Sequence, residues 1–295
     1  MGSHVALNRQ FAPVSFSQIK TETDDDYYWD IEGTKAKHWD DLNHRYRCVI
    51  LAEAGAGKTE ELRQHALELS EQAKPAFFIR IEDITTGFDQ AFEVGDEAQF
   101  QAWLKSTDEA WFFLDSVDEA RLDNPRTFEK ALRVFAKTIK HGAHRAHIYL
   151  SSRPYAWRPN EDKRLLDDLL FYPAGTNSEH KTALTVYTMC PLNEERIRRF
   201  CEAREAANID SLLKEIERAN LWGLSERPFD LEGILLKWAE DSELGSRLIM
   251  LHHNIDIQLR DEHNTDRAQR QPLNLEQAPR FSASPDSSNT TFHVF

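Results

Sequence analysis

A lysine and a threonine close the stretch Ala52-Glu53-Ala54-Gly55-Ala56-Gly57-Lys58-Thr59, which directly follows the apolar run 48–51. The spacing is that of G-x-x-x-x-G-K-[ST], with alanine at a first position that needs a compact residue. Small residues let successive backbone N–H groups curl around a phosphate, and a following helix points its positive end at the same place. The stretch therefore predicts a strand, a phosphate-binding loop and a helix in succession, with phosphate contacts from Ala54 through Glu60.

Two side chains of this loop carry the charge and the metal chemistry. Lys58 is a mobile positive charge that can reach the β- and γ-oxygens of a nucleoside triphosphate. Thr59 offers a hydroxyl to Mg²⁺. We therefore expect ATP or ADP together with Mg²⁺ as ligands, with ATP preferred over GTP and Thr59 as one of the metal ligands.

A carboxylate follows the apolar run 111–114, at the point where that strand is expected to end. Asp115 would lie at the carboxyl edge of a parallel sheet, where open α/β sheets bind ligands, and would hold the Mg²⁺ shell opposite Thr59. Asp118 and Glu119 follow, and either one suits a residue that orients the attacking water or accepts its proton. The sequence leaves the choice between these two open.

A polar turn ends the next expected strand, where Ser151, Ser152 and Arg153 follow the apolar run 147–150. We expect their hydroxyl groups and the guanidinium within reach of the γ-phosphate. Arg153 would stabilise charge that builds up there or report whether the phosphate is present. The predicted catalytic set is therefore Lys58, Asp115, Asp118, Glu119 and Arg153.

Apolar runs alternate with amphipathic segments over residues 45–191. The runs 48–51, 76–79, 111–114, 147–150 and 184–187 are mostly continuous, which is typical of strands covered on both faces of a parallel sheet. Two intervening segments place apolar residues at helical spacing: Leu62, Ala66, Leu69 and Ala73, and then Phe128, Leu132, Phe135 and Ile139. The alternation predicts a doubly wound α/β domain with a five-stranded parallel P-loop sheet of the ASCE class.

Composition divides the rest of the chain. Residues 1–44 show little periodicity and carry an acidic, aromatic stretch at 21–30, so we expect a solvated leader or linker, with a lid or partner-binding strip as the alternative. Residues 192–262 lose the strand signal and show helical spacing, with Asn193 as a helix cap, which predicts a small all-α subdomain. Residues 263–295 are polar and are expected to form a disordered tail.

Charge and cysteine content restrict the class of protein. Lys and Arg total 36 against 50 Asp and Glu, a net charge of −14, which argues against a general polyanion-binding protein. No apolar run approaches the ~18 residues of a membrane span, and no secretory signal is visible. Three cysteines without CxxC spacing fit reduced thiols. We therefore expect a cytoplasmic protein that contacts neither membrane nor nucleic acid directly.

Taken together, these motifs resemble the NACHT family of STAND nucleoside triphosphatases. The resemblance covers residues 45 to about 260 and is carried by the loop 52–59, the acidic segment 112–119 and the Ser-Arg-Pro end of the segment 150–154. A small residue, Ser116, directly after the metal aspartate fits this family, whereas ordinary AAA+ ATPases have Asp and Glu adjacent. The resemblance also implies that Pro228, in Arg227-Pro228-Phe229-Asp230-Leu231, lies against the nucleotide base.

The same resemblance implies a function and exposes departures. It implies a switch that ADP holds closed and ATP opens for self-association, under control of a trigger or effector protein, and bacterial relatives act in antiphage defence. STAND proteins usually continue into a winged-helix domain and a repeat array, which do not fit into the last 35 residues. The chain is therefore expected to be a fragment or a pared-down member, and the change of composition near Pro279 favours truncation.

We expect slow hydrolysis, because no residue of a single subunit is an obvious arginine finger. Two other functions stay open. An AAA+-like ATPase that remodels or loads on nucleic acid would need a basic surface, and the sequence offers one cluster of arginines: Arg196, Arg198, Arg199 and Arg204. A scaffold that binds nucleotide without hydrolysing it would retain ADP and show no turnover.

Overall fold

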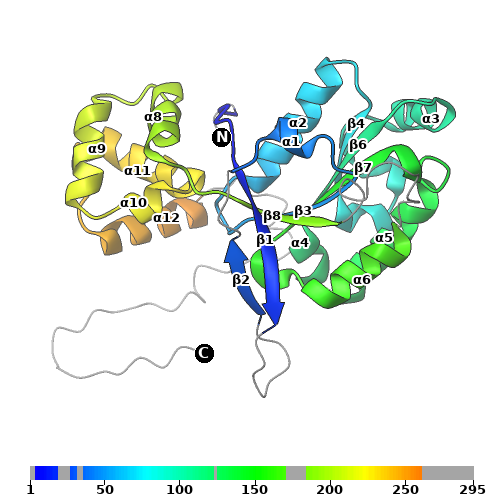
Figure 1. Ribbon diagram of the computed structural model, residues 1–295. Coiled ribbons are helices and arrows are strands. Elements are labelled where there is room, and N and C mark those ends of the chain that lie inside the picture. Colours follow the sequence, from blue (N-terminus) through cyan, green and yellow to red (C-terminus); the bar gives the residue numbers. More distant parts are fainter. Residues whose placement is uncertain (1–3, 19–26, 32–35, 123–124, 171–183, 261–295) are drawn as a thin grey trace.

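The strand, loop and helix predicted from residues 48–59 lie in the middle of a large mixed sheet. The computed structural model describes residues 4–18, 27–31, 36–122, 125–170 and 184–260. In this part of the chain an eight-stranded sheet is flanked by helices, and a second group of helices lies to one side of it (Figure 1). The order of the strands is β2-β1-β8-β3-β7-β6-β4-β5.

The five predicted strands are confirmed and form the parallel centre of this sheet. Across the sheet they are β8 (Thr185–Met189), β3 (Arg47–Leu51), β7 (Ala146–Ser152), β6 (Ala110–Asp115) and β4 (Ala76–Arg80). The phosphate-loop strand β3 lies between β8 and β7, and β7 separates it from β6, which ends in Asp115. This inserted strand gives the predicted ASCE arrangement, and it brings the carboxyl ends of β3, β7 and β6 to one edge.

Three further strands extend the sheet in antiparallel orientation, and the sequence pattern did not predict them. They are β1 (Phe11–Gln18) on β8, β2 (Tyr27–Ile31) on β1, and β5 (Phe92–Val94) on β4. The expected solvated leader is therefore wrong for residues 5–14, since Val5, Leu7, Phe11 and Val14 are buried. The alternation of apolar and polar residues in this N-terminal segment covers only a few positions. Its packing partners, β8 and the helical subdomain, are distant in sequence, so a local pattern does not reveal them. Of the acidic aromatic stretch, residues 21–26 lie outside the described ranges.

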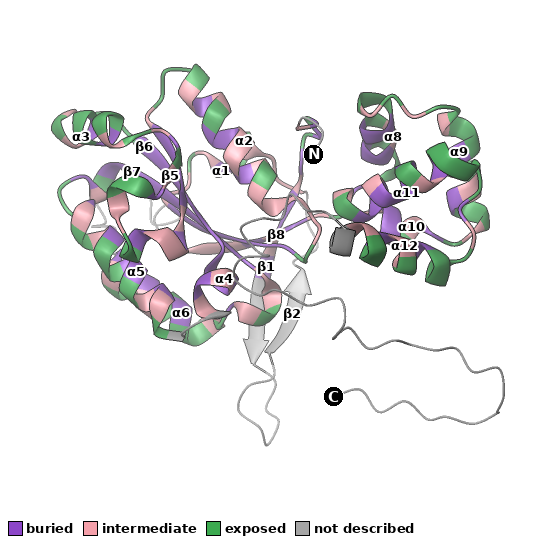
Figure 2. Cartoon of the chain, turned by 180° about the vertical axis from the view of Figure 1, so that it is seen from behind, coloured by how far each residue is buried: buried purple, intermediate pink, exposed green. Residues whose placement is uncertain are grey.

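Helices cover both faces of the sheet, as continuous apolar strands require. On one face, α1 (Trp39–Leu42) and α2 (Lys58–Glu71) pack against Cys48, Ile50 and Phe78. The opposite face, which carries Val49 and Phe112, is covered by α3 (Glu97–Lys105), α4 (Val117–Leu122), α5 (Pro125–Thr138) and α6 (Pro159–Leu169). Successive side chains of a strand enter opposite cores, so consecutive residues of the central strands are buried and these strands are mostly purple in Figure 2.

The helix α2 ends two residues before Ala73, the last apolar position of the predicted helical spacing. Ala73 is exposed and adopts a φ of +58°, beyond the last helical residue, Glu71. The N–H of Lys74 bonds to the carbonyl of Leu69 at 3.0 Å, which closes the helix with a left-handed residue at its C-terminus. The spacing in α5 is confirmed, because Phe128, Leu132 and Phe135 are buried, as is Ile139 directly after the helix.

A group of five helices follows β8 and confirms the predicted helical part. It comprises α8 (Glu194–Ala203), α9 (Ile209–Arg218), α10 (Trp222–Ser225), α11 (Pro228–Asp241) and α12 (Arg247–Arg260). Asn193 caps α8 as expected, since its side chain accepts the N–H of Arg196. Val5 and Leu7 complete the core of this group. Within the described ranges no helix has the length and apolarity needed to cross a membrane, and the predicted tail at 263–295 lies outside them.

Candidate functional site

The loop between β3 and α2 is shaped by two glycines. Gly55 and Gly57 adopt φ angles of +77° and +82°, which an L side chain rarely takes. A Cβ atom on Gly55 would also lie 3.1 Å from Cβ of Phe229, at the start of α11. Gly57 is the N-cap of α2 and supplies no side-chain cap, which leaves the first-turn N–H groups directed at the cavity in front of the helix.

Asp115 is buried at the end of β6 and accepts hydrogen bonds from three hydroxyl groups. Thr59 Oγ1 donates to Asp115 Oδ2 at 2.7 Å, and Ser116 Oγ donates to the same oxygen at 3.0 Å. Ser151 Oγ donates to Asp115 Oδ1. The carboxylate is only 2% exposed, and in the described part of the chain no basic side chain forms an ion pair with it.

These donors fit Mg²⁺, the metal expected from the sequence. A carboxylate and a hydroxyl are the hard oxygen ligands that this ion prefers, and Mg²⁺ usually takes one or two protein groups together with phosphate oxygens and water. The proton of Thr59 already points to Asp115, so its lone pairs are available to a cation. No group of three or more His, Cys, Asp or Glu side chains in the described residues is placed to hold a metal ion by itself.

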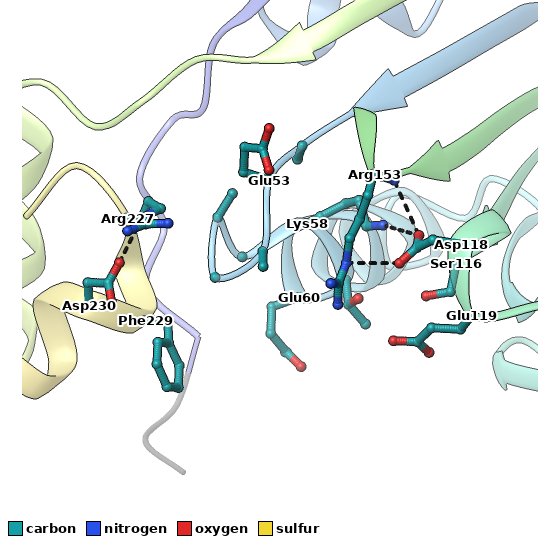
Figure 3. A pocket seen from close by; sticks show the side chains of 16 residues that line it. Glu53, Lys58, Glu60, Ser116, Asp118, Glu119, Arg153, Arg227, Phe229 and Asp230 are labelled. Atoms are coloured by element: carbon teal, nitrogen blue, oxygen red, sulfur yellow. Dashed lines mark hydrogen bonds and ion pairs between the residues drawn. The ribbon is translucent and has the colours of Figure 1, made fainter. Parts of the chain in front are cut away.

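Asp118 lies on α4 and forms ion pairs with two basic side chains, Lys58 and Arg153 (Figure 3). Lys58 Nζ lies 3.2 Å from Asp118 Oδ1, and Arg153 Nε lies 2.9 Å from Asp118 Oδ2. The backbone N–H of Arg153 adds a bond to Oδ1 at 3.2 Å. The side chain of Asp118 is 3% exposed, against 10% for Lys58 and 26% for Arg153, so both charge pairs are partly shielded from water and are stronger than fully exposed pairs.

A cavity of about 520 Å³ joins these groups. Predicted site residues that line it are the whole loop 52–59 with Glu60, Asp118, Glu119 and Arg153. Two predicted residues do not line this cavity: Asp115 is buried behind Thr59 and Ser116, and Pro228 lines a neighbouring cavity. The serine hydroxyls expected near the γ-phosphate are also elsewhere, because Ser151 bonds to Asp115 and Ser152 Oγ donates to the carbonyl of Arg153 at 3.0 Å.

The helical subdomain contributes residues that sequence reasoning did not assign to the site. Arg227, Phe229 and Asp230 line the same cavity from the start of α11. Arg227 Nε pairs with Asp230 Oδ2 at 2.7 Å, and Asn254 of α12 donates to Asp230 Oδ1 at 3.0 Å. These residues are neighbours of Pro228 in the sequence, which was the only indication that they could lie near the nucleotide. The sequence does not show that the helical subdomain packs against the loop 52–59.

A second cavity of about 620 Å³ lies beside the first. It is bounded by the N-terminal segment 4–9, by the loop at Gly55–Gly57 and by Pro228 with its neighbours on α11. Arg9, in its wall, is 3% exposed, and burial lowers its pKa while Glu61 opposes that shift. Arg9 Nη2 donates to the carbonyl of Cys190 at 3.1 Å, whereas its Nε and Nη1 are buried without a hydrogen-bond partner.

Thiol chemistry has no support in the described residues. Burial raises the pKa of Cys48 to about 12 and that of Cys201 to about 11. Both thiols therefore stay protonated near neutral pH, which makes them poor nucleophiles.

Comparisons with known proteins add a similarity of fold. No protein-family model matches the chain, and no curated protein matches it. Among solved structures, it is similar to a Walker-type ATPase of Pyrococcus abyssi, with a TM-score of 0.43 and 11% identity over 79% of this chain and 74% of that one.

Two further similar structures are DNA-bound proteins. The Aeropyrum pernix ORC1 protein in complex with DNA gives a TM-score of 0.42 and 13% identity over 77% of this chain and 63% of that one. The replication initiator DnaA, bound to AMPPCP and single-stranded DNA, gives a TM-score of 0.35 and 16% identity over 78% of this chain and 61% of that one. At TM-scores below 0.5 these likenesses carry no argument about activity. The strand order and the loop 52–59 by themselves give the chain a P-loop NTPase fold.

Proposed function

We propose that this chain is a Mg²⁺-dependent P-loop ATPase that binds ATP or ADP and hydrolyses ATP slowly. The observation that carries the proposal is the convergence of the loop 52–59, Asp118 and Arg153 on one cavity of about 520 Å³. A lysine, an arginine and a row of backbone donors around one space match the charge and shape of a polyphosphate.

Binding of the polyphosphate would exchange partners at Asp118. Lys58 and Arg153 are both paired with this carboxylate, at 3.2 and 2.9 Å. A triphosphate would draw Lys58 to its β- and γ-oxygens and Arg153 to the γ-phosphate, where positive charge stabilises the transition state of phosphoryl transfer. ADP lacks the γ-phosphate and would leave Arg153 on Asp118. The two nucleotides would therefore hold Arg153 in different places.

Glu119 is the better candidate for the residue that orients the attacking water. Glu119 lines the phosphate cavity together with Asp118, and we assign Asp118 to holding Lys58 and Arg153, which leaves the water-orienting role to Glu119 in this proposal. Glu119→Gln and Asp118→Asn in a phosphate-release assay test the assignment. Thr59 and Asp115 would hold Mg²⁺, which supplies charge neutralisation on the phosphates when bound. The protein itself provides orientation and a shielded site.

The second cavity would receive the nucleotide base. It shares Gly55–Gly57 with the phosphate cavity, so a ligand gripped at its phosphates reaches it directly. Pro228, Phe229 and Leu236 give it apolar walls suited to a flat aromatic ring. The N-terminal segment, rather than being a leader, would then be part of the nucleotide site.

We further propose that the nucleotide acts as a switch of the NACHT type, with ADP favouring a closed state and ATP a self-associating one. The support is a backbone bond of 3.2 Å from Phe229 N–H to the carbonyl of Gly55, which ties α11 to the phosphate loop. A change in that loop would therefore reach the helical subdomain directly. A trigger or effector protein and a role in antiviral defence in the cytoplasm complete the proposal.

Phosphate release tests the catalytic part of this proposal. We expect wild type to release phosphate from ATP slowly in Mg²⁺ and not in EDTA, and Lys58→Ala and Asp115→Ala to abolish release. Lys130→Ala removes an exposed lysine of α5 and serves as the control. GTP in parallel reactions tests the preference for ATP. Activity that survives both site substitutions would contradict the proposal.

The arginines that would favour the alternative of nucleic-acid remodelling are paired with acidic side chains or buried. Arg198 pairs with Asp210 at 2.7 Å, Arg199 with Glu195 at 3.0 Å, and Arg204 with Glu232 at 2.9 Å. Arg196 is buried and donates to the carbonyls of Leu7 and Asn8. We therefore propose no direct nucleic-acid contact for this cluster. Salt-dependent binding of single- or double-stranded DNA or RNA by the wild type would favour the alternative.

Particle mass separates the switch from a scaffold that never hydrolyses. We expect an increase in mass with a non-hydrolysable ATP analogue and none with ADP. Bound ADP that persists through purification, without turnover or change of mass, would favour the scaffold.

A further inference from the structure

Ser151 lies at the end of β7 and has no exposed surface. The register of the two parallel strands pairs Leu114 with Leu150, which brings the residues that follow, Asp115 and Ser151, next to each other. Ser151 Oγ accepts the backbone N–H of Ser116 at 2.8 Å and donates to Asp115 Oδ1. The hydroxyl therefore joins the ends of two strands at the proposed metal site.

These two bonds fix the direction of the hydroxyl proton. A serine hydroxyl has one proton to donate, and the N–H of Ser116 occupies its acceptor side, so its proton is directed to Asp115. Ser116 adopts a φ of +69°, which is unfavourable for a residue with a side chain. The bonds from its N–H to Ser151 and from its Oγ to Asp115 hold it there. One carboxylate oxygen is thus committed to Ser151, and the other faces Thr59.

We infer that Ser151 is a positioning residue for the divalent cation that accompanies the nucleotide. It orients Asp115 so that Oδ2 and the Thr59 hydroxyl face the same point, 2.7 Å apart. This inference rests on the proposed function. It differs from the expectation that the Ser-Ser-Arg turn acts on the γ-phosphate, because Ser151 acts on the metal carboxylate and only Arg153 lines the phosphate cavity.

The chain offers a matched control in the adjacent residue. Ser152 is as fully buried as Ser151 and lies on the same strand. Its hydroxyl donates to the carbonyl of Arg153 at 3.0 Å and does not touch Asp115. Ser152→Ala therefore removes the same atom from an equally buried place without touching the metal carboxylate.

The test measures binding of Mn²⁺, a paramagnetic substitute for Mg²⁺, to the ADP complex of the full chain by electron paramagnetic resonance. We expect Ser151→Ala to weaken Mn²⁺ binding about 10- to 100-fold, the usual loss when the partner of a metal ligand is removed. Ser152→Ala should bind Mn²⁺ like wild type. Binding of ADP in EDTA, which needs no metal, should be unchanged in both variants, and thermal melting checks that they fold.

Ser151→Cys keeps the test decisive if the alanine variant does not fold. A thiol fills nearly the same space but is a weak donor, so the same loss of Mn²⁺ affinity is expected. Wild-type Mn²⁺ affinity in the folded Ser151 variants, or an equal loss in Ser152→Ala, would overturn the inference. Absence of ADP binding by wild type in EDTA would instead overturn the proposed function, and the inference with it.

Discussion

The two cavities of this protein differ in how their charges are satisfied. In the cavity of about 520 Å³, which we propose for the phosphates and call the phosphate side, Lys58 and Arg153 are both paired with Asp118 within 3.2 Å. In the cavity of about 620 Å³, which we propose for the base and call the base side, Arg9 is 3% exposed and two of its nitrogens have no hydrogen-bond partner. The phosphate side is preorganised but closed on itself, so a ligand must compete with Asp118. The base side instead carries an uncompensated cost of burial that a ligand or a water molecule could offset.

The largest effect is expected from a substitution in the N-terminal segment 4–9, which lines the cavity on the base side. Leu7→Ala should lower the free energy of unfolding by about 2–4 kcal/mol, because Leu7 is buried in the core of the helical subdomain. It should also weaken nucleotide binding, since the segment 4–9 lines the cavity. Denaturant unfolding and nucleotide titration measure both effects. Leu67→Ala, on the exposed side of α2, is the control. Equal effects of the two substitutions would contradict a structural role for the N-terminal segment.

Removing the negative charge of Asp118 on the phosphate side should tighten nucleotide binding and reduce turnover. Asp118→Asn keeps the shape of the side chain but removes the charge that competes with phosphate for Lys58 and Arg153. We expect ADP to bind about threefold to tenfold more tightly, the scale of one ordinary hydrogen bond, in a calorimetric titration in EDTA. Asp89→Asn, at an exposed position, should bind like wild type. Weaker binding by Asp118→Asn would show that the carboxylate does not compete with phosphate.

Removing the positive charge of Arg9, two of whose nitrogens lack a hydrogen-bond partner, tests whether the base side carries a cost of burial that the phosphate side does not. Arg9→Met has a similar length and no charge, so without ligand it should raise the free energy of unfolding by about 1 kcal/mol. In the presence of nucleotide the gain should be smaller, because the ligand would lose a donor in the cavity wall. Chemical denaturation with and without ADP measures the difference. Arg164→Met, at an exposed site, should change neither value. A loss of stability without ligand would mean that Arg9 is satisfied in the free protein.

The smallest effect concerns the buried face of α2, behind the phosphate loop. His65 stacks on Trp39 with ring centroids 4.0 Å apart, and burial, helped by Lys74, lowers its pKa from 6.5 to about 3. Because the folded pKa lies below the unfolded one, the stability it contributes is complete above pH 6.5 and is lost as the pH falls toward 3. Between pH 7 and 6, wild type should lose about 0.7 kcal/mol more than His65→Gln.

Thermal melting at the two pH values provides the measurement. His44→Gln, at an exposed position, is the control and should follow wild type. A wild-type stability that is flat over this range, or that rises as the pH falls, would contradict a neutral His65.

The centre of the sheet could be predicted because its signals are local. The strands β3, β4 and β6 each contain one continuous apolar run, and the loop 52–59 follows β3 directly. β1 could not be predicted in this way, because its apolar residues need β8, far along the chain, to become buried. Arg9 likewise depends on the carbonyl of Cys190. Long-range pairing leaves no mark on a short window of sequence.

Within the site, residue types were predictable and their partners were not. The sequence placed Asp118 and Arg153 near one nucleotide but left open that they bind each other at 2.9 Å. The bond from Ser151 to Asp115 depends on the register of β6 and β7, which no motif specifies. Arg227 and Asp230 enter the site through the packing of α11 against the loop. Side-chain contacts between separate elements are therefore what the structure adds.

A crystal structure with ADP and Mg²⁺ tests the central claim most directly. We predict density for the β-phosphate within the loop 52–59, with Lys58 Nζ withdrawn from Asp118 toward a phosphate oxygen and the base lying against Pro228. Density for the nucleotide at another place, or an empty loop at millimolar ADP with Lys58 still on Asp118, would contradict the account.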